Sequence, residues 1–203
     1  MKKIFAIAFS VCFCIIISAF RFTGDSLPIG STLPLGDVKM KNINNALVSM
    51  HDAKKQNGLL VIFSCNTCPY VIKNQERMKA ICNYALQQQI GVIVLNSNEA
   101  QRNDDDSFDA MKTYATQQSY SWFYTVDVNS TIADTFGAKR TPECFLFNKQ
   151  LKLTYHGAID DNPTEPDNVT RQHLREAISQ QATGSEITIK ESRSVGCGIK
   201  RKG

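Results

Sequence analysis

The chain has 203 residues, of which 42% are hydrophobic and 21% charged, a composition that excludes a disordered, fibrous or multi-span membrane protein. A chain of this length buries a sizeable core without help from metals or disulfides. The formal net charge is only +4, and Lys2 and Lys3 supply two of those charges, so the sequence does not predict a nucleic-acid partner.

Residues 1–20 have the pattern of a targeting segment. Lys2 and Lys3 precede an apolar run over residues 4–20, and Ala19 supplies a small residue that suits cleavage of a signal peptide over residues 1–19. The same run is just long enough to remain as an uncleaved membrane anchor. Both alternatives predict an exported, periplasmic or otherwise extracytoplasmic protein that contacts the membrane only through this leader. Disulfides persist in such a compartment.

The remainder alternates between strand and helix patterns. Leu59–Phe63 is a short, wholly apolar run that predicts a strand buried on both faces, and residues 70–88 carry apolar side chains at helical spacing. Asp104–Asp106 are expected at a helix N-terminus, where they complement the helix dipole better than they would form a metal site. Further strands are predicted at 92–95, 123–128, 144–147 and 151–155, and further helices at 103–119, at 130–136 and in a segment ending at Gly184.

This order predicts an α/β fold with a central mixed sheet, parallel strands closed by an antiparallel hairpin, and helices on both faces. One domain over residues 28–182 accounts for the whole pattern, followed by a tail over residues 183–203.

Cys65 and Cys68 form a C-x-x-C motif between the first buried strand and the first long helix. The free N–H groups at a helix N-terminus stabilise a thiolate and lower the pKa of a nearby cysteine. We therefore expect Cys65, which precedes the helix, to be the more exposed and more acidic thiol. Cys68 would resolve mixed disulfides and pair with Cys65 in a redox-active disulfide, with no other cofactor.

A C-x-x-C pair also occurs as half of a zinc site. The sequence has no second such pair, and His51, His156 and His173 lack the spacing of metal ligands, so the pattern favours redox chemistry and no metal. Copper or zinc carriage by Cys65 and Cys68, without catalysis, remains an alternative.

The other cysteines outside the leader, which make an odd total of five with the motif, have separate expected roles. Cys82 lies in the apolar stripe of the first long helix, which predicts a buried structural thiol. Cys144 follows Pro142 by two residues, so it either packs in the core or contacts the redox centre. Cys197 lies in a Gly-Cys-Gly tail without a core pattern, which predicts an exposed, reactive thiol whose partner the sequence does not identify.

Several short motifs, in a fixed order, resemble the peroxiredoxin-like branch (redoxin or AhpC/TSA-like) of the thioredoxin superfamily. They are Phe63-Ser-Cys-Asn-Thr-Cys-Pro-Tyr-Val71, Leu95-Asn-Ser-Asn98, Gly137-Ala138 with Thr141-Pro142, Phe145-Leu-Phe147, Tyr155-His-Gly-Ala-Ile-Asp-Asp161 and Val195-Gly-Cys-Gly-Ile-Lys200. The resemblance implies a thioredoxin-like fold. It also implies a cis Thr141–Pro142 bond in a loop that faces the cysteines and holds a partner chain.

Two departures from that family decide which reaction we expect. Thr67 stands between the cysteines where this branch usually has histidine, and Ile62 stands where a peroxiredoxin has the Thr or Ser of its peroxide-binding motif. We therefore expect thiol–disulfide exchange with disulfide-containing or dithiol proteins, supported by a thiol reductant, with Cys65 attacking. A thiol peroxidase acting through Cys65 is the alternative, and Arg140 beside the partner-binding loop keeps it open.

Overall fold

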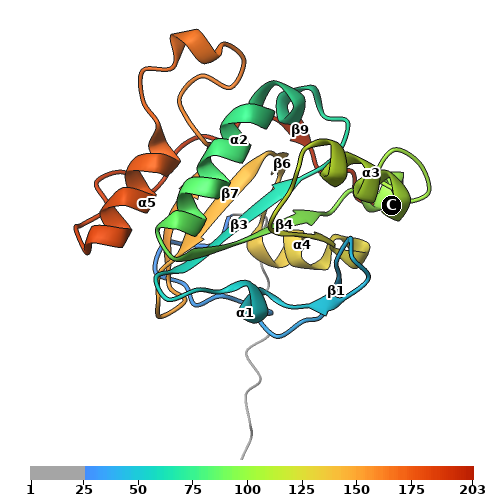
Figure 1. Cartoon of the computed structure of the whole chain (residues 1–203), viewed down its shortest axis with the longest axis horizontal. Coiled ribbons are helices and arrows are strands. Elements are labelled where there is room, and N and C mark those ends of the chain that lie inside the picture. Colours follow the sequence, from blue (N-terminus) through green and yellow to red (C-terminus); the bar gives the residue numbers. More distant parts are fainter. Residues whose placement is uncertain (1–25) are drawn as a thin grey trace, which may run out of the picture.

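The computed structural model describes residues 26–203, so the predictions for the leader lie outside the described residues. Its centre is a five-stranded sheet in the order β5-β4-β3-β7-β8 (Figure 1). Strands β3, β4 and β5 are parallel, whereas β7 is antiparallel to both β3 and β8, which confirms the predicted mixed sheet. The bounds are β3 (Gly58–Ser64), β4 (Ile90–Asn96), β5 (Phe123–Val126), β7 (Glu143–Phe147) and β8 (Leu153–Gly157).

Helices cover both faces of this sheet, as predicted. Side chains alternate across a strand, so Leu60 and Ile62 of β3 join one core cluster while Leu59, Val61 and Phe63 join another. The first cluster packs under α2 (Pro69–Gln87), α3 (Phe108–Gln117) and α5 (His173–Thr183), and the second packs against α1 (Met50–Ala53) and α4 (Thr131–Phe136). None of these helices in the described part of the chain is both long and apolar enough to cross a bilayer.

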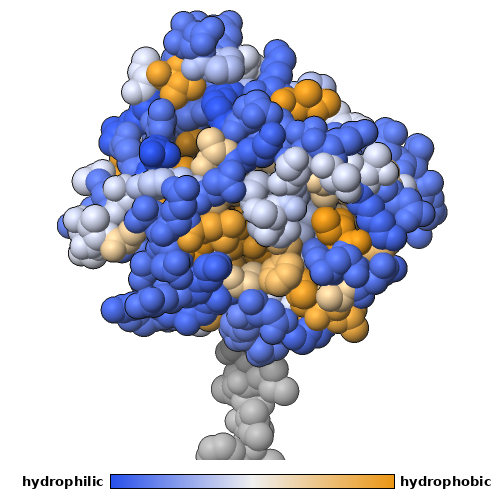
Figure 2. Space-filling view, in the orientation of Figure 1, coloured by the Kyte–Doolittle hydropathy of each residue, from blue (hydrophilic) through white to orange (hydrophobic). Residues whose placement is uncertain are grey.

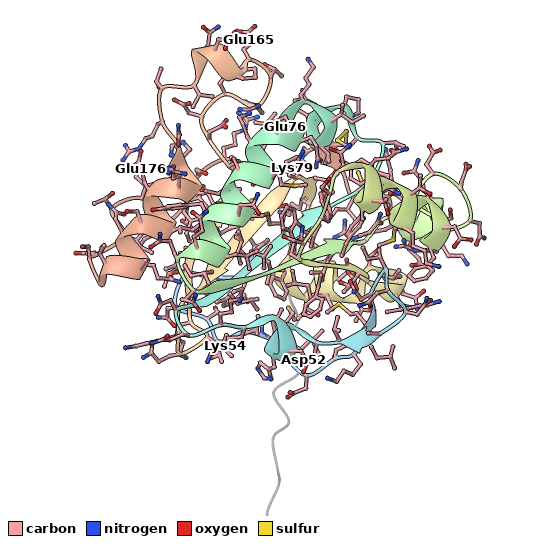
Figure 3. All side chains as sticks on the ribbon, viewed as in Figure 1. Asp52, Lys54, Glu76, Lys79, Glu165 and Glu176 are labelled. Carbon is pink, nitrogen blue, oxygen red and sulfur yellow. A yellow bond between two sulfur atoms is a disulfide. The ribbon has the colours of Figure 1, made fainter. Side chains whose placement is uncertain are left out.

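In helix α2 the apolar side chains that predicted the helix face the core. Val71, Met78 and Cys82 on its inner side are completely buried. Glu76 and Lys79 lie on its outer side and form an ion pair of 3.2 Å (Figure 3). The visible surface is mainly hydrophilic, with apolar residues exposed between α2 and α1 and beside β1 (Figure 2).

The expectation for Asp104–Asp106 was wrong. Helix α3 begins only at Phe108, and its N-cap is Ser107, whose hydroxyl accepts from the Ala110 N–H. The three acids precede the helix in a turn, and Asp106 is completely buried instead of facing solvent at a helix end.

Short elements complete the described chain. They are β1 (Met40–Lys41), β2 (Leu47–Val48), β6 (Arg140–Thr141), β9 (Cys197–Gly198) and the 3₁₀ turns η1 (Glu99–Gln101), η2 (Val128–Ser130) and η3 (Pro166–Asn168). Helix α5 ends at Gly184, whose positive φ of 75° suits glycine as a helix terminator. The tail then runs back over the domain: Glu191 pairs with His156, and β9 lies beside β6 (Figure 1).

Candidate active site

Cys65 and Cys68 lie where the sequence predicted, at the junction of β3 and α2. Strand β3 ends at Ser64, Cys68 is the N-cap residue of α2, and Pro69 occupies its first turn, where no N–H is needed. The Cys65 Sγ is 3.4 Å from the Oγ1 of Thr141, and the Cys68 Sγ is 3.3 Å from the Thr141 carbonyl oxygen. Both sulfur atoms therefore contact one residue of the loop before β7.

That loop has the conformation that the family resemblance implied. The Thr141–Pro142 peptide bond is cis, as expected. Thr141 is almost completely buried, and its segment β6 runs past the two cysteines. Thr141 and the C-x-x-C motif, separated by about 75 residues of sequence, are thus brought together.

The prediction that Cys65 is the exposed, acidic thiol was wrong. Only 1% of Cys65 is exposed, against 4% of Cys68, and burial raises the pKa of the Cys65 thiol above its ordinary value. The hydrogen bond with Thr141 lowers this pKa, and the negative charge of Asp106 raises it further. The helix N-terminus favours Cys68 instead, because Cys68 is the N-cap and Cys65 precedes it by three residues.

The disulfide of the site joins Cys68 to Cys197, with a Cα–Cα distance of 6.0 Å, and does not join Cys68 to Cys65 as expected. Cys65 therefore carries a free thiol. Cys197 is only partly exposed and packs against the cluster formed by Cys65, Cys68 and Val71. The expected reactive tail cysteine thus has a partner 129 residues away, which no spacing in the sequence identified.

Cys82 and Cys144 lie apart from this centre. Both are completely buried in the core cluster under α2, and burial raises the pKa of each thiol. Cys82 is the buried thiol that the helix stripe predicted. For Cys144 the core-packing alternative holds, since it belongs to that cluster and not to the one containing Cys65 and Cys68.

A buried polar network, which the sequence did not predict, holds the motif loop from behind. Asp106 accepts hydrogen bonds from the Asn66 backbone N–H at 2.9 Å, from Asn96 Nδ2 at 2.7 Å and from Asn98 Nδ2 at 2.8 Å. The Tyr124 hydroxyl donates to the Asn66 side-chain oxygen at 2.8 Å. The Leu95-Asn-Ser-Asn98 motif contained two members of this network, but nothing in its spacing linked it to Asp106.

Glu143, whose role no sequence pattern indicated, holds the segment at Lys139 and Arg140 that precedes Thr141. Its carboxylate is buried and accepts from the backbone N–H groups of Lys139 and Arg140 at 2.7 and 2.8 Å. His156 Nε2 lies 2.7 Å from the other carboxylate oxygen. The Arg140 guanidinium is exposed and donates to the Gly196 carbonyl oxygen at 3.4 Å, so its hydrogen bond goes to the tail.

A small cavity of about 220 Å³ opens beside the sulfur atoms. Its size suits a small molecule or one side chain of a partner. The residues that line it are Cys65, Thr67, Cys68, Pro69, Asn98, Gln101, Cys197 and Lys200.

The fold and the cysteine centre define a thioredoxin-like redox protein, and comparisons with known proteins agree. The model of the Redoxin family matches residues 24–173, more than half of the chain, so the protein belongs to the Redoxin family. None of the curated proteins matches the chain.

Solved structures support the same fold. A hypothetical protein from Sinorhizobium meliloti has 27% identity and a TM-score of 0.80, covering 88% of this chain and 97% of its own. An uncharacterised conserved protein from Geobacillus kaustophilus has 29% identity and a TM-score of 0.80, covering 86% and 93%. A thiol:disulfide interchange protein DsbE from Chlorobium tepidum has 18% identity and a TM-score of 0.57, covering 78% and 98%, and shows the fold alone.

Proposed function

We propose that this protein is a thiol–disulfide oxidoreductase that exchanges disulfides with partner proteins through Cys65 and Cys68. The observation that carries the proposal is the cysteine centre itself. A free thiol, Cys65, lies beside a disulfide-bonded sulfur, Cys68, and both contact Thr141 of the loop that contains the cis Thr141–Pro142 bond. Membership of the Redoxin family supports an oxidoreductase in general.

The reaction needs two exchange steps. One thiolate attacks a sulfur of the partner's disulfide and forms a mixed disulfide, while the partner's second sulfur leaves as a thiolate and takes a proton. The other cysteine then attacks the sulfur of the first, which releases the reduced partner and leaves a Cys65–Cys68 disulfide. A thiol reductant restores the pair by two further exchanges.

Burial and helix geometry favour Cys68 as the sulfur that bonds the partner, which reverses the roles expected from the sequence. Cys68 is the N-cap of α2, where the helix dipole stabilises a thiolate. It is also the sulfur already bonded to a second chain segment, through Cys197. Cys65 is more deeply buried and stands as the resolving thiol.

Thr141 and Pro142 supply the edge on which an extended partner chain would lie. Such an edge holds a peptide through main-chain hydrogen bonds, as an added strand does. The edge of Thr141 already pairs with an extended segment, β9, which supports its ability to bind one.

The contacts of Cys65 give less support to a peroxidase. A peroxidatic cysteine needs donors arranged around its sulfur to stabilise the charge that develops as the O–O bond breaks. The Cys65 sulfur is hydrogen-bonded to the Thr141 hydroxyl, whereas the Arg140 guanidinium donates its hydrogen bond to the Gly196 carbonyl oxygen. Exchange is therefore the better-supported reaction.

The test removes each cysteine in turn from a Cys197→Ser background, so that the tail cannot capture a partner. We expect Cys65→Ser to accumulate a mixed disulfide through Cys68 with disulfide-containing proteins of a cell extract or with insulin, and Cys82→Ala, which keeps both motif cysteines, to turn over without trapping. Trapping only in Cys68→Ser would restore the roles expected from the sequence. Trapping in neither variant, together with fast peroxide consumption that depends on Cys65, would replace exchange by peroxidase chemistry.

A further inference from the structure

The tail of this protein pairs with the backbone edge at Thr141, on which a partner chain would lie in the proposed function. Strand β9 pairs antiparallel with β6, so that Cys197 lies opposite Thr141 and Gly198 opposite Arg140. Cys197 is bonded to Cys68, the sulfur that would bond a partner. Backbone pairing and disulfide together reproduce what a mixed disulfide with an extended partner would require.

The tail is held by more than the disulfide. Beyond Cys197, the Ile199 N–H donates to the Lys139 carbonyl at 3.1 Å, and the Ile199 side chain joins the second core cluster. The Lys200 N–H donates to Asn98 Oδ1 at 2.8 Å. The Arg201 Nε donates to Asp134 at 2.6 Å. These contacts add to the covalent bond in holding the segment against the site.

The two glycines around Cys197 differ in a way that reveals how close the tail backbone lies. A Cβ on Gly196 would stand 2.2 Å from the Thr141 carbonyl oxygen and 2.7 Å from its carbon, both backbone atoms that cannot swing away. A Cβ on Gly198 would meet nothing within 4 Å. The approach of the tail to Thr141 therefore depends on the absence of a side chain at residue 196 alone.

We propose that residues 196–201 form a built-in substrate strand and that Cys197 is a third redox cysteine, which competes with partner proteins for Cys68. This proposal rests on the proposed function. It assigns to the Cys68–Cys197 disulfide the role of a closed state, in which no partner chain reaches the Thr141 edge.

Internal exchange opens that state without any outside oxidant. The Cys65 thiolate attacks the Cys68 sulfur, the Cys65–Cys68 bond forms and the Cys68–Cys197 bond breaks. Cys197 leaves as a thiolate and takes the proton that Cys65 gave up. The number of disulfides is unchanged, so the oxidised protein is an equilibrium between a closed isomer and an open one.

The first experiment maps the disulfides of the oxidised full-length protein after acid quenching, alkylation and digestion. We expect wild-type protein to contain mainly the Cys68–Cys197 bond, with Cys65 alkylated. Gly196→Ala should lower the ratio of Cys68–Cys197 to Cys65–Cys68 disulfide at least about fivefold, because the added methyl group overpacks against fixed backbone. Gly198→Ala is the matched control and should keep the wild-type ratio.

The second experiment measures access to Cys68. The probe is the peptide Val-Gly-Cys-Gly-Ile-Lys, the sequence of residues 195–200, linked to glutathione through its cysteine. The reduced protein attacks the peptide sulfur and glutathione leaves. A tethered competitor acts at millimolar effective concentration, so about 0.1 mM peptide should be captured roughly tenfold more by Cys65→Ser/Cys197→Ser than by Cys65→Ser.

Three results would overturn the inference: oxidised wild-type protein with only the Cys65–Cys68 bond, equal ratios in the two glycine variants, or equal capture by the two serine variants. Neither the mapping nor the glycine comparison needs a partner protein. Failure of the proposed function, seen as no trapping of protein partners, would therefore leave these results standing and is distinguishable from failure of the inference.

Discussion

Asp106→Asn separates the stability of the motif loop from the acidity of its thiol. The wild-type carboxylate accepts three hydrogen bonds, from Asn66, Asn96 and Asn98, while completely buried. Asparagine keeps the shape, but it replaces one acceptor oxygen by an NH₂ group. That group faces another donor, so one charge-assisted hydrogen bond is lost and the other two become neutral.

The loss of stability follows from those bonds. A hydrogen bond to a charged group contributes about 1.5–3 kcal/mol, so the substitution should lower the free energy of unfolding by roughly 3 kcal/mol. For a folded unit of this size that corresponds to a decrease of about 6–12 °C in the thermal midpoint. Thermal unfolding of the oxidised protein measures it. Asp104→Asn is the matched control, since Asp104 is exposed and its loss removes the same charge.

The same substitution should make Cys65 more acidic, because the negative charge of Asp106 raises the pKa of that thiol. Removing the charge lowers the pKa, and the alkylation rate of Cys65 should then rise at lower pH than in wild-type protein. Iodoacetamide labelling over a pH series, read by mass spectrometry, measures it. A labelling profile of Asp106→Asn that stays in place or moves to higher pH, or a stability equal to that of Asp104→Asn, would refute the reasoning.

Two further predictions follow from the same site, and a third concerns the leader. In wild-type protein the hydrogen bond with the Thr141 hydroxyl lowers the pKa of Cys65, so Thr141→Val should raise that pKa. The labelling profile should then move to higher pH, opposite to the shift expected for Asp106→Asn. Reducing the Cys68–Cys197 bond, which closes a loop of 129 residues, should lower the unfolding free energy by up to about 5 kcal/mol in denaturant titrations; a change below about 1 kcal/mol would contradict this. Fractionation with N-terminal sequencing should find a chain that starts near Phe20 or a full-length membrane-bound one, whereas a soluble cytoplasmic chain that keeps Met1 would contradict export.

Local patterns in the sequence were enough to predict most of the fold. The apolar run at Leu59–Phe63 and the stripe through Met78 and Cys82 each reflect burial that a short segment carries by itself, and both elements are present. The junction of strand and helix at Cys65 and Cys68 follows from them. The cis Thr141–Pro142 bond came from the family resemblance, which supplied a long-range arrangement that no local pattern contains.

What the sequence could not predict depends on side chains that meet across the fold. Asp106 looked like a helix-end acid because its partners, Asn66, Asn96 and Asn98, come from two other segments of the chain. The acidity expected for Cys65 failed for a related reason: the helix N-terminus is a local effect, whereas burial of Cys65 is set by the whole fold. Cys197 had no local pattern at all, and only the folded chain brings it to Cys68.

Two buried carboxylates, Asp106 and Glu143, hold the loops of the site in place, and Asp106 also raises the pKa of Cys65. Asp106 ties down the motif loop and Glu143 ties down the segment before Thr141, and each does so by accepting backbone N–H groups. The charge on Asp106, together with burial, disfavours a Cys65 thiolate. Rigid positioning is therefore obtained at the expense of thiol acidity. Release of the tail, which packs against the cysteines, would admit water and remove part of the burial that opposes ionisation. The reactivity of Cys65 is thus coupled to the position of Cys197.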